Sequence, residues 1–478
     1  MASTRPELIK PSDARAWSLC ARRVWLDNKG DLELAPVEDD FEQLIIQLGL
    51  AHEQVIFEKL ANKFEVRTAH SFENTRQLIA ERVPVIYQAQ LVDEAEGLVG
   101  YPDFLILNEN GEYQAADAKL SLSAEKEEIK VQLGVYRKLL ANQFPAIVFL
   151  GDGQQALIGE EADKVTNKFI REMQNLLRST EQPPARYSHS KCTACPYYQH
   201  CRPAFEAKGE LSLLYGINGR SVPALEQEGI RTITDLAASD PAQIPDVPYL
   251  KGEDKIERAV LQAQSYLSGE VIQRSPVTLP DGQWIHFDIE DNPVTENSGK
   301  HVYLWGFLVP EYGPANFEYV WTDGAEDDEA GWIEFLNQVE RYRQQYPHLV
   351  LAHYSAHEVS TIRSYAERYN MQDHTTVKYL LGEESPLFDL QKPVLQSLVL
   401  PLQGYGLKDI CKHPDLVNFQ WEDDDSGSQW SVVQFNRYLL ETDPQTRADL
   451  KAEILSYNRD DVTATRRLEE WLRDNFAP

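Results

Sequence analysis

The chain has 478 residues, of which 42 % are hydrophobic and 26 % charged, and it carries a net charge of −30. This length exceeds what a single hydrophobic core usually fills, so it predicts two or three domains. The acidic balance argues against a surface that coats nucleic acid broadly, although a local basic groove beside an acidic metal site stays open.

Three common signals are missing from the sequence. The N-terminal stretch MASTRPELIKPSDAR lacks the apolar core of a secretory signal, and no apolar run approaches the ~20 residues of a membrane span. No GxxxxGK[ST] phosphate-binding loop occurs, so we expect no ATPase activity of the chain's own. We therefore expect a cytoplasmic protein with no membrane partner. In that reducing compartment, clustered cysteines serve metal or redox chemistry more often than disulfides.

The first region, residues 1–205, mixes amphipathic helices with short apolar strands and contains carboxylates in a metal-binding pattern. Asp103 opens the apolar strand YPDFLIL, and Asp117 and Lys119 share one face of the next strand, ADAKL, because side chains alternate with period two. If these strands pair as a hairpin around NENGEY, the three side chains meet at one sheet edge. Two carboxylates there would hold Mg²⁺ or Mn²⁺, and the lysine would polarise the attacking water.

Two predicted helices flank these strands with further candidate residues. His52, in LAHEQVIFEKL, could supply a third metal ligand, and Gln132 and Tyr136 lie one helical turn apart and face the same side. A single D-x-K on a strand is more typical of a solvated face, and a single helical histidine is more often structural. The interpretation therefore depends on all these residues occurring in this order.

Three of the five cysteines are concentrated in KCTACPYYQHC, where Cys192, Cys195 and Cys201 form a C-x₂-C-x₅-C pattern. Cys20 stands alone far upstream, and Cys411 lies in a different region. The spacing is compatible with zinc or with an iron–sulfur cluster. Structural zinc sites usually combine two pairs of ligands, each pair close together in the sequence. Here a single cysteine lies far upstream of a group of three. No thioredoxin-like βαβ unit surrounds the C-x-x-C, which argues against a redox pair.

Taken together, these motifs resemble the D…(D/E)xK arrangement of RecB-type nucleases over about residues 15–205. The resemblance implies a PD-(D/E)xK, restriction-endonuclease-like domain over residues 1–208 that hydrolyses phosphodiester bonds. Its catalytic residues would be Asp103, Asp117, Lys119, Gln132 and Tyr136. Its metal ligands would be His52, Asp103 and Asp117. The CRISPR-associated and AddB-like branches carry a [4Fe–4S] cluster, so the resemblance also implies one on Cys20, Cys192, Cys195 and Cys201.

A helical module follows at residues 209–272, in which LLYGINGRSVPALEQEGIRTITDLAASDP resembles a helix–hairpin–helix element. Gly216 and Gly219 would form the hairpin. The residues expected to pack the following helix are Ile230, Ile233 and Leu236. Such elements bind a backbone phosphate through main-chain N–H groups without reading sequence. The alternative is a helical spacer with no ligand.

Beyond the linker SPVTLPDGQ, a second set of acids has the spacing of a two-metal site. Asp288 and Glu290 lie on one face of the strand HFDIE, and Tyr457 and Asp461 lie on one face of the helix containing YNRDD. Glu358, in LAHYSAHEVSTI, is a further acid between them. Acids that converge in this way bind two Mg²⁺ ions about 3.5–4 Å apart around a scissile phosphate. Tyr457 would then position the attacking water.

This second set resembles the DEDD exonucleases of the ribonuclease-H-like fold that end in a Y-x₃-D motif, across about residues 283–475. The resemblance implies a ribonuclease-H-like domain over residues 280–478, with metal ligands Asp288, Glu290, Glu358 and Asp461 and with Tyr457 as a catalytic residue. The segment GYGLKDI resembles the short S-L-K segment of that family. One departure concerns the second motif, where His353 and Glu358 replace the usual asparagine and aspartate. The domain is therefore either an active exonuclease or a degenerate one kept for binding.

The whole order of modules resembles the bacterial family of RecB-like nucleases, whose longer members continue into a helicase. We therefore expect an α/β multidomain, Mg²⁺- or Mn²⁺-dependent nuclease that acts on DNA at single strands or ends, with RNA also open as a substrate. Its last domain would be a 3′–5′ exonuclease. The alternative is a non-catalytic nucleic-acid-binding adaptor, or end clamp, that works with a separate helicase.

Overall fold

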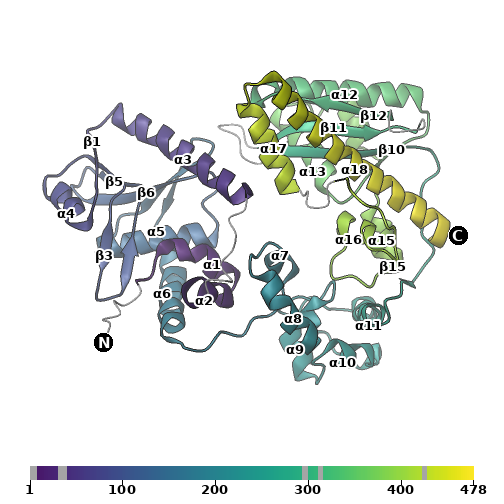
Figure 1. Cartoon of the computed structure of the whole chain (residues 1–478), viewed down its shortest axis with the longest axis horizontal. Coiled ribbons are helices and arrows are strands. Elements are labelled where there is room, and N and C mark those ends of the chain that lie inside the picture. Colours follow the sequence, from purple (N-terminus) through teal and green to yellow (C-terminus); the bar gives the residue numbers. More distant parts are fainter. Residues whose placement is uncertain (1–7, 31–39, 293–299, 311–315, 423–427) are drawn as a thin grey trace. The chain divides into compact units, whose positions relative to one another are not determined.

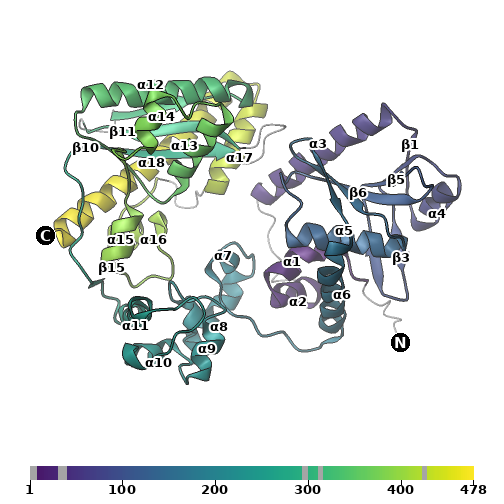
Figure 2. The same cartoon turned by 180° about the vertical axis from the view of Figure 1, so that it is seen from behind.

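The structure is a computed structural model and describes residues 8–30, 40–292, 300–310, 316–422 and 428–478. The first seven residues of the N-terminal stretch considered above lie outside this part of the chain. The described residues form two compact units, unit 1 within residues 1–185 and unit 2 from residue 186 onward. Each unit holds a β-sheet with helices on both faces, as Figure 1 and the reverse view in Figure 2 show. Throughout the described part, no helix is both long enough and apolar enough to cross a membrane.

Unit 1 is built on a mixed six-stranded sheet of order β1-β2-β5-β6-β7-β8 and a separate pair, β3-β4. The strands are β1 (Val66–Thr68), β2 (Val85–Tyr87), β3 (Leu91–Asp93), β4 (Leu98–Gly100), β5 (Phe104–Leu107), β6 (Tyr113–Lys119), β7 (Ala146–Leu150) and β8 (Gln155–Ile158). The helices are α1 (Ala14–Leu19), α2 (Ala21–Lys29), α3 (Asp40–Ala61), α4 (Phe72–Ala80), α5 (Glu127–Leu140) and α6 (Asp163–Arg178). The predicted hairpin is confirmed, because β5 and β6 pair antiparallel with Phe104 opposite Ala116.

The sheet of unit 1 lies between α3 and α5. Successive residues of β5 point to opposite faces: Phe104 packs with Ile56 and Leu60 of α3, and Leu105 packs with Leu133 of α5. This alternation follows from the period-two geometry of a strand. Both faces are consequently apolar along the middle of the sheet, and polar side chains gather at the end of the hairpin where Asp103 and Asp117 lie.

Unit 2 contains a five-stranded sheet of order β12-β11-β10-β13-β14. Strands β10, β11 and β12 are antiparallel neighbours, and β13 and β14 run parallel to β10. The strands are β10 (Gln283–Asn292), β11 (His301–Leu308), β12 (Phe317–Trp321), β13 (Leu349–His353) and β14 (Leu387–Asp389). The helices around them are α12 (Asp328–Gln345), α13 (His357–Arg368), α14 (Thr375–Leu381), α15 (Gln391–Ser397), α16 (Leu407–Cys411), α17 (Ser428–Leu440) and α18 (Pro444–Phe476).

Strand β10 divides its side chains between the two faces of this sheet. Phe287 and its neighbours two residues away join a buried cluster with Trp332 and Phe335 of α12. The alternate residues face α17 and α18, which Figures 1 and 2 show on the opposite side of the sheet from α12. Because Asp288 is one of these alternate residues, its carboxylate points toward α18.

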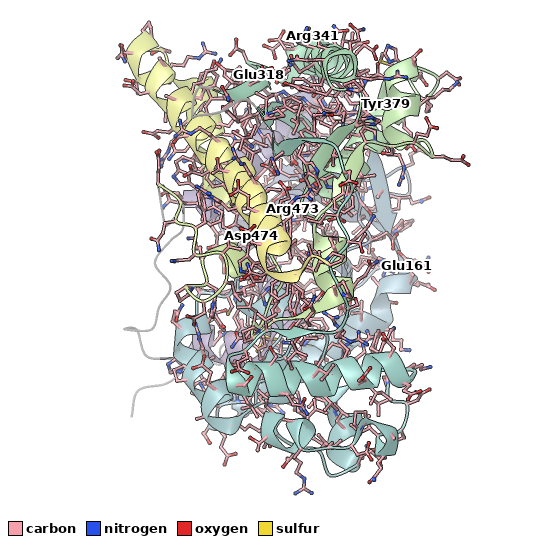
Figure 3. All side chains as sticks on the ribbon, turned by 90° about the vertical axis from the view of Figure 1, so that its right-hand side faces the viewer. Glu161, Glu318, Arg341, Tyr379, Arg473 and Asp474 are labelled. Carbon is pink, nitrogen blue, oxygen red and sulfur yellow. The ribbon has the colours of Figure 1, made fainter. Side chains whose placement is uncertain are left out.

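Charged side chains of α18 contact side chains of β10 along most of the strand. Arg473, near the C-terminal end of α18 in Figure 3, lies over the ring of Trp284, with its guanidinium carbon 4.8 Å from the ring centroid. One turn earlier, Glu469 lies 3.1 Å from the Nε2 atom of His286. Successive contacts are four residues apart on the helix and two residues apart on the strand. The preceding turns of α18 therefore lie next to Asp288 and Glu290 of β10.

The middle module belongs to the same compact unit as the C-terminal sheet. It comprises α9 (Val222–Gln227), α10 (Ile233–Ala237), α11 (Glu253–Ser268) and β9 (Ile272–Gln273), and the last of these pairs with β15 (Leu398–Val399). Gln262 of α11 donates to the carbonyl oxygen of Leu400 at 2.7 Å. The linker predicted near residue 275 therefore does not separate two independent packing units.

The helix–hairpin–helix interpretation of the middle module stays a prediction. Gly216 and Gly219, the expected hairpin glycines, lie between the short 3₁₀-helix Leu211–Leu213 and α9. The turn that joins α9 to α10 contains Gly229, whose φ of +86° lies in the left-handed region that glycine adopts readily. All three positions expected to pack against the following helix are buried, since Ile230, Ile233 and Leu236 are 7 %, 2 % and 1 % exposed, the last two within α10.

Candidate metal centres

The first candidate centre lies at the end of the β5–β6 hairpin in unit 1. The backbone N–H of Asp103 donates to Asp117 Oδ1 at 3.1 Å, and the backbone N–H of Ala118 donates to Asp103 Oδ2 at 2.8 Å. Lys119 Nζ lies 2.9 Å from Asp117 Oδ2. The structure thus brings the predicted D…D-x-K residues together at one end of the neighbouring strands β5 and β6.

Burial and like charge shape the electrostatics of this centre. Burial, together with the charge of Asp117, raises the pKa of Asp103 well above its usual range. Burial alone would lower the pKa of Lys119, but the charges of Asp117 and Asp103 outweigh it, so the lysine pKa is raised. Lys119 therefore stays protonated beside two acids, whose mutual repulsion a divalent cation would relieve.

The structure presents Glu53 at this centre and gives His52 a different environment. His52 is buried, and its Nε2 atom lies 3.3 Å from the carbonyl oxygen of Phe149. The charge of Glu53 instead acts on both Asp103 and Lys119. The Glu53 Oε1 atom is buried and has no hydrogen-bond partner among the described residues. Sequence reasoning missed Glu53, although an acid directly after the candidate histidine on the same helix was a usable signal.

Glu53 and Asp103 also border a cavity of about 330 Å³. Its other lining residues include Gln88, Gln90 and Tyr101. The amide and phenol groups offer hydrogen bonds next to the acids. The cavity thus gives a ligand in unit 1 access to Glu53 and Asp103.

The two predicted residues of α5 lie together on the face that supports the hairpin. Gln132 Nε2 donates to Tyr136 Oη at 3.0 Å, and Tyr136 Oη donates to the carbonyl oxygen of Tyr101 at 3.1 Å. Burial raises the pKa of Tyr136 well above its usual range, and the charge of Asp117 adds to the effect. The pair therefore fixes the segment that leads into Asp103.

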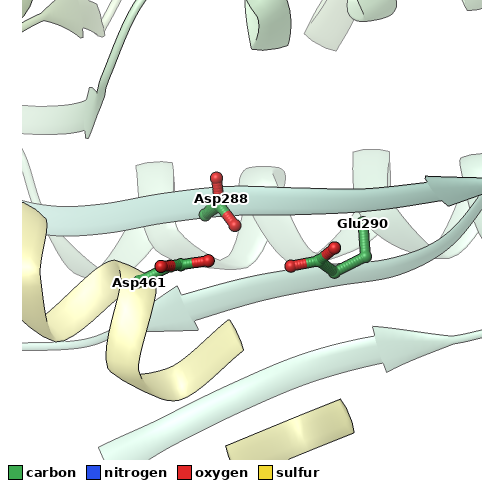
Figure 4. Close-up of side chains that lie close together, drawn as sticks. All are labelled: Asp288, Glu290 and Asp461. Carbon is green, nitrogen blue, oxygen red and sulfur yellow. The ribbon is translucent and has the colours of Figure 1, made fainter. Parts of the chain in front are cut away.

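The second candidate centre combines β10 with α18 in unit 2. Asp288, Glu290 and Asp461 offer carboxylate oxygens that all lie within 4.8 Å of one another. Figure 4 shows their three side chains close together. The first two are two residues apart on one face of the strand, and Asp461 comes from the helix that covers this face. Carboxylate oxygens are the ligands that Mg²⁺ and Mn²⁺ prefer, so this donor set fits either ion.

Three buried or half-buried acids at such close range hold their protons more strongly than usual. Burial and the charge of Asp461 raise the pKa of Glu290 to about 8. Burial raises the pKa of Asp461 to about 6, although Lys408 and a 2.8 Å hydrogen bond from Trp421 Nε1 work against this. Burial and both other acids also raise the pKa of Asp288 well above its usual range. A bound cation would replace these protons.

These pKa shifts predict how the stability of the metal-free protein changes with pH. Glu290 binds more protons in the folded chain than in the unfolded chain between about pH 4.5 and about pH 8, its usual and raised pKa values, and this exceeds the opposite contribution of any single buried histidine with a lowered pKa, such as His286. The free energy of unfolding should therefore fall as the pH rises through this window. Thermal melts with chelator below, within and above the window would measure the fall. Mn²⁺ should reverse it and Glu290→Gln should weaken it, whereas a flat profile for the unmodified chain would contradict the raised pKa values.

Tyr457 and Lys408 lie beside the three acids. Lys408 Nζ donates to Tyr457 Oη at 3.3 Å and lies 4.7 Å from the centroid of the tyrosine ring. Tyr457 in turn is hydrogen-bonded to Asp461. A cavity of about 440 Å³ adjoins this tyrosine, and its lining includes Trp430 and Gln434. The phenol predicted to orient water thus lies between the acids and open space.

The other predicted ligand, Glu358, lies outside the group of three. Its Oε2 atom lies 3.1 Å from His353 Nδ1, and the two side chains are 3 % and 1 % exposed. Its charge still contributes to the raised pKa of Asp288. The ligand role of Glu358 therefore stays a prediction, whereas its pairing with the histidine that replaces the usual asparagine is a structural observation.

Sequence reasoning missed Asn458, which reaches two of the acids from α18. Its Nδ2 atom donates to Asp288 Oδ2 at 2.8 Å and to Glu290 Oε1 at 3.4 Å. The motif YNRDD contained a signal, because Asn458 precedes Asp461 by three residues and so lies on the same helical face.

The four cysteines predicted as cluster ligands are divided between the units. Cys20 lies between α1 and α2 of unit 1. Cys192, Cys195 and Cys201 lie in unit 2, on or between α7 (His189–Cys192) and α8 (Tyr198–Lys208). Within the described part of unit 2, the sulfur atoms of Cys192, Cys195 and Cys201 do not form a group as close as that of the three acids. All four are half-buried, whereas Cys411 is fully buried in the core of unit 2.

Comparison with known protein families finds a nuclease-type superfamily in each half of the chain. The model of the PD-(D/E)XK nuclease superfamily matches residues 20–202, and the model of the RNase_H superfamily matches residues 285–473. The chain thus carries one domain of each superfamily, which agrees with the two sheets and supports nuclease activity in general. No curated protein matches the chain.

Proposed function

We propose that the protein is a divalent-metal-dependent nuclease that hydrolyses phosphodiester bonds of DNA at single strands or ends, with a RecB-type site in unit 1. The observation that carries this proposal is the cluster of Asp103, Asp117 and Lys119 at the end of the β5–β6 hairpin. The buried carboxylate of Asp117 and the half-buried carboxylate of Asp103 supply hard oxygen ligands for Mg²⁺ or Mn²⁺. The bound ion would supply Lewis acidity and lower the pKa of a bound water.

The side chains around these carboxylates have distinct parts in this proposal. Lys119 keeps its proton because of the neighbouring acids, so it offers a fixed positive charge to the negative charge that develops on the phosphate. Glu53, rather than His52, is the better candidate for a third oxygen ligand, because its buried Oε1 atom has no partner within the described chain. Gln132 and Tyr136 hold the segment before Asp103 in place.

Unit 2 is proposed as a second, 3′–5′ exonuclease site. Asp288, Glu290 and Asp461 would hold the metal, and Tyr457 would orient the attacking water from its position beside Asp461. The pairing of Glu358 with His353 favours a second candidate function for this domain, a clamp that binds ends without cutting. The two functions differ in whether strand ends are shortened, so an assay can separate them.

Digestion of end-labelled DNA tests these proposals. Single-stranded and duplex substrates, labelled at either end, would be incubated with the full chain and Mn²⁺ or with chelator. Loss of label from one end defines polarity, and a parallel RNA substrate defines the type of nucleic acid. Metal-dependent cleavage that survives inactivation of either site alone but not of both would support two active sites. Binding without cleavage of any substrate would instead favour the adaptor function.

We further propose a [4Fe–4S] cluster on Cys20, Cys192, Cys195 and Cys201. The support is the single cysteine before the nuclease core, the C-x₂-C-x₅-C pattern after it, and the half-buried state of all four thiols. Four thiolates satisfy such a cluster. The match to the PD-(D/E)XK family model covers all four positions. When bound, the cluster would link the two ends of this domain.

Protein purified without air should be brown and contain iron and sulfide in equal amounts. Cys192→Ala should remove the colour and lower the melting temperature, because binding of a cluster is coupled to folding. Cys411→Ala is the matched control and should keep the colour, since this thiol is buried in the core against the carbonyl oxygen of Ala464. Zinc in place of iron in anaerobic protein would contradict the proposal.

A further inference from the structure

Asn458 is completely buried at the meeting point of α18 and β10. Its exposed fraction is 0 %, and its Nδ2 atom donates to Asp288 Oδ2 at 2.8 Å and to Glu290 Oε1 at 3.4 Å. One amide group therefore bridges two of the three acids in the second candidate centre. It does so from the helix that also carries Asp461, three residues later on the same face.

The sheet leaves room for this amide at one position of β11. Gly306 lies directly opposite Asp288 in the antiparallel pairing of β10 with β11. A Cβ atom on Gly306 would lie 1.7 Å from Asn458 Oδ1, a distance that no side chain tolerates. The glycine thus provides the space in which the amide sits. The Oδ1 atom is buried without a hydrogen-bond partner in the described chain, so the donors of Asn458, not its acceptor, explain its position.

An amide suits this place for chemical reasons. It offers two N–H donors on one nitrogen, so it can orient two carboxylates at once. It carries no charge, so it does not compete with a cation as a lysine or arginine would. An aspartate here would add a fourth negative charge to a buried acidic group, and a serine would offer one donor only.

We propose that Asn458 is a positioning residue that holds the carboxylates of Asp288 and Glu290 in the orientation that binds a divalent cation. Gly306 is the backbone position that makes this contact possible. This inference rests on the metal binding proposed for unit 2 and adds residues that the acidic motif does not contain. Donors that orient metal ligands in this way commonly change metal affinity about 10–100-fold when they are removed.

Calorimetric titration with Mn²⁺ tests the inference in the full-length chain, with Asp117→Asn in the background to weaken the first centre. Asn458→Leu keeps a similar side-chain shape but lacks both donors, and it should bind Mn²⁺ about 10–100-fold more weakly. Its melting temperature in chelator measures separately what the loss of a donor to two carboxylates costs the fold. Gly306→Ala should weaken binding as well, because it displaces the amide. Trimming by Asn458→Leu should recover when the Mn²⁺ concentration is raised.

Asn436→Ala is the matched control. Asn436 is a buried asparagine of α17 whose Nδ2 atom donates to the carbonyl oxygen of Val432 at 2.8 Å, and it should leave Mn²⁺ affinity unchanged. If Asn458→Leu fails to fold, Asn458→Ala serves as the second variant with the same expected loss of affinity. Parent-like affinity in a folded variant would overturn the inference alone. A parent chain that binds Mn²⁺ without trimming any strand would overturn the proposed exonuclease function and leave this inference intact. A parent chain without Mn²⁺ binding would overturn both.

Discussion

Lys119→Ala should slow metal-dependent cleavage at the first centre about 10²–10³-fold, the loss expected when one preorganised charge no longer meets the transition state. The lysine ammonium lies 2.9 Å from Asp117 and is not placed to bind a cation itself, so metal affinity should change little. Single-turnover cleavage of labelled single-stranded DNA would measure the rate. Asp461→Asn in the background would prevent the second centre from contributing.

Lys138→Ala provides a matched control for this prediction. Lys138 is an exposed lysine of α5 whose Nζ atom donates to Asn167 Oδ1 at 3.4 Å, away from the acids. This variant should cleave at the parent rate. If Lys119→Ala also cleaved at the parent rate, the RecB-type assignment of unit 1 would be wrong, even if cleavage itself depended on metal.

Asp288→Asn should abolish binding of Mn²⁺ at the second centre and lower trimming more than about 10²-fold, because both ions of a two-metal site need this central carboxylate. The same change removes one of three like charges at close range, so the metal-free chain should melt at a higher temperature than the parent. Calorimetry in an Asp117→Asn background, with a melting curve in chelator, would measure both effects.

The exposed Asp415 offers the control for Asp288→Asn, since Asp415→Asn changes the same charge on the surface of unit 2. It should alter neither the heat of Mn²⁺ binding nor the melting temperature in chelator. Unchanged heat in Asp288→Asn would show that the three acids are not metal ligands. Normal binding by the parent chain with no trimming on any strand would make the domain a clamp.

Sequence alone predicted the residues whose positions depend on local periodicity. The period-two alternation of a strand placed Asp117 beside Lys119 and Asp288 beside Glu290, and the helical repeat placed Tyr457 near Asp461. The hairpin that brings Asp103 to Asp117 followed from a short polar turn between apolar strands. Each of these arrangements depends on contacts between residues that are close in the sequence or on one element.

Residues whose roles depend on how whole elements pack were harder to predict. Glu53 could be distinguished from His52 only once the face of α3 that meets the sheet was known. Asn458 fits beside the acids because Gly306, on a strand far away in the sequence, has no side chain there. No pattern in the sequence around either residue indicates this space. The middle helices form one unit with the C-terminal sheet for a similar reason, since Gln262 bonds to a carbonyl more than a hundred residues later.

The position of α18 sets the order of events when the protein is made. Strand β10 is synthesised long before the helix that supplies Asp461 and Asn458, so a growing chain exposes Asp288 and Glu290 without those partners. Two carboxylates on one strand hold a divalent ion weakly, because coordination by the third acid and orientation by the amide are both absent. We therefore expect unit 2 to fold first and the proposed metal to bind afterwards, unlike small zinc domains in which the ion itself drives folding. A shortage of metal in the cell would then leave the domain intact but inactive, and ready to be loaded later.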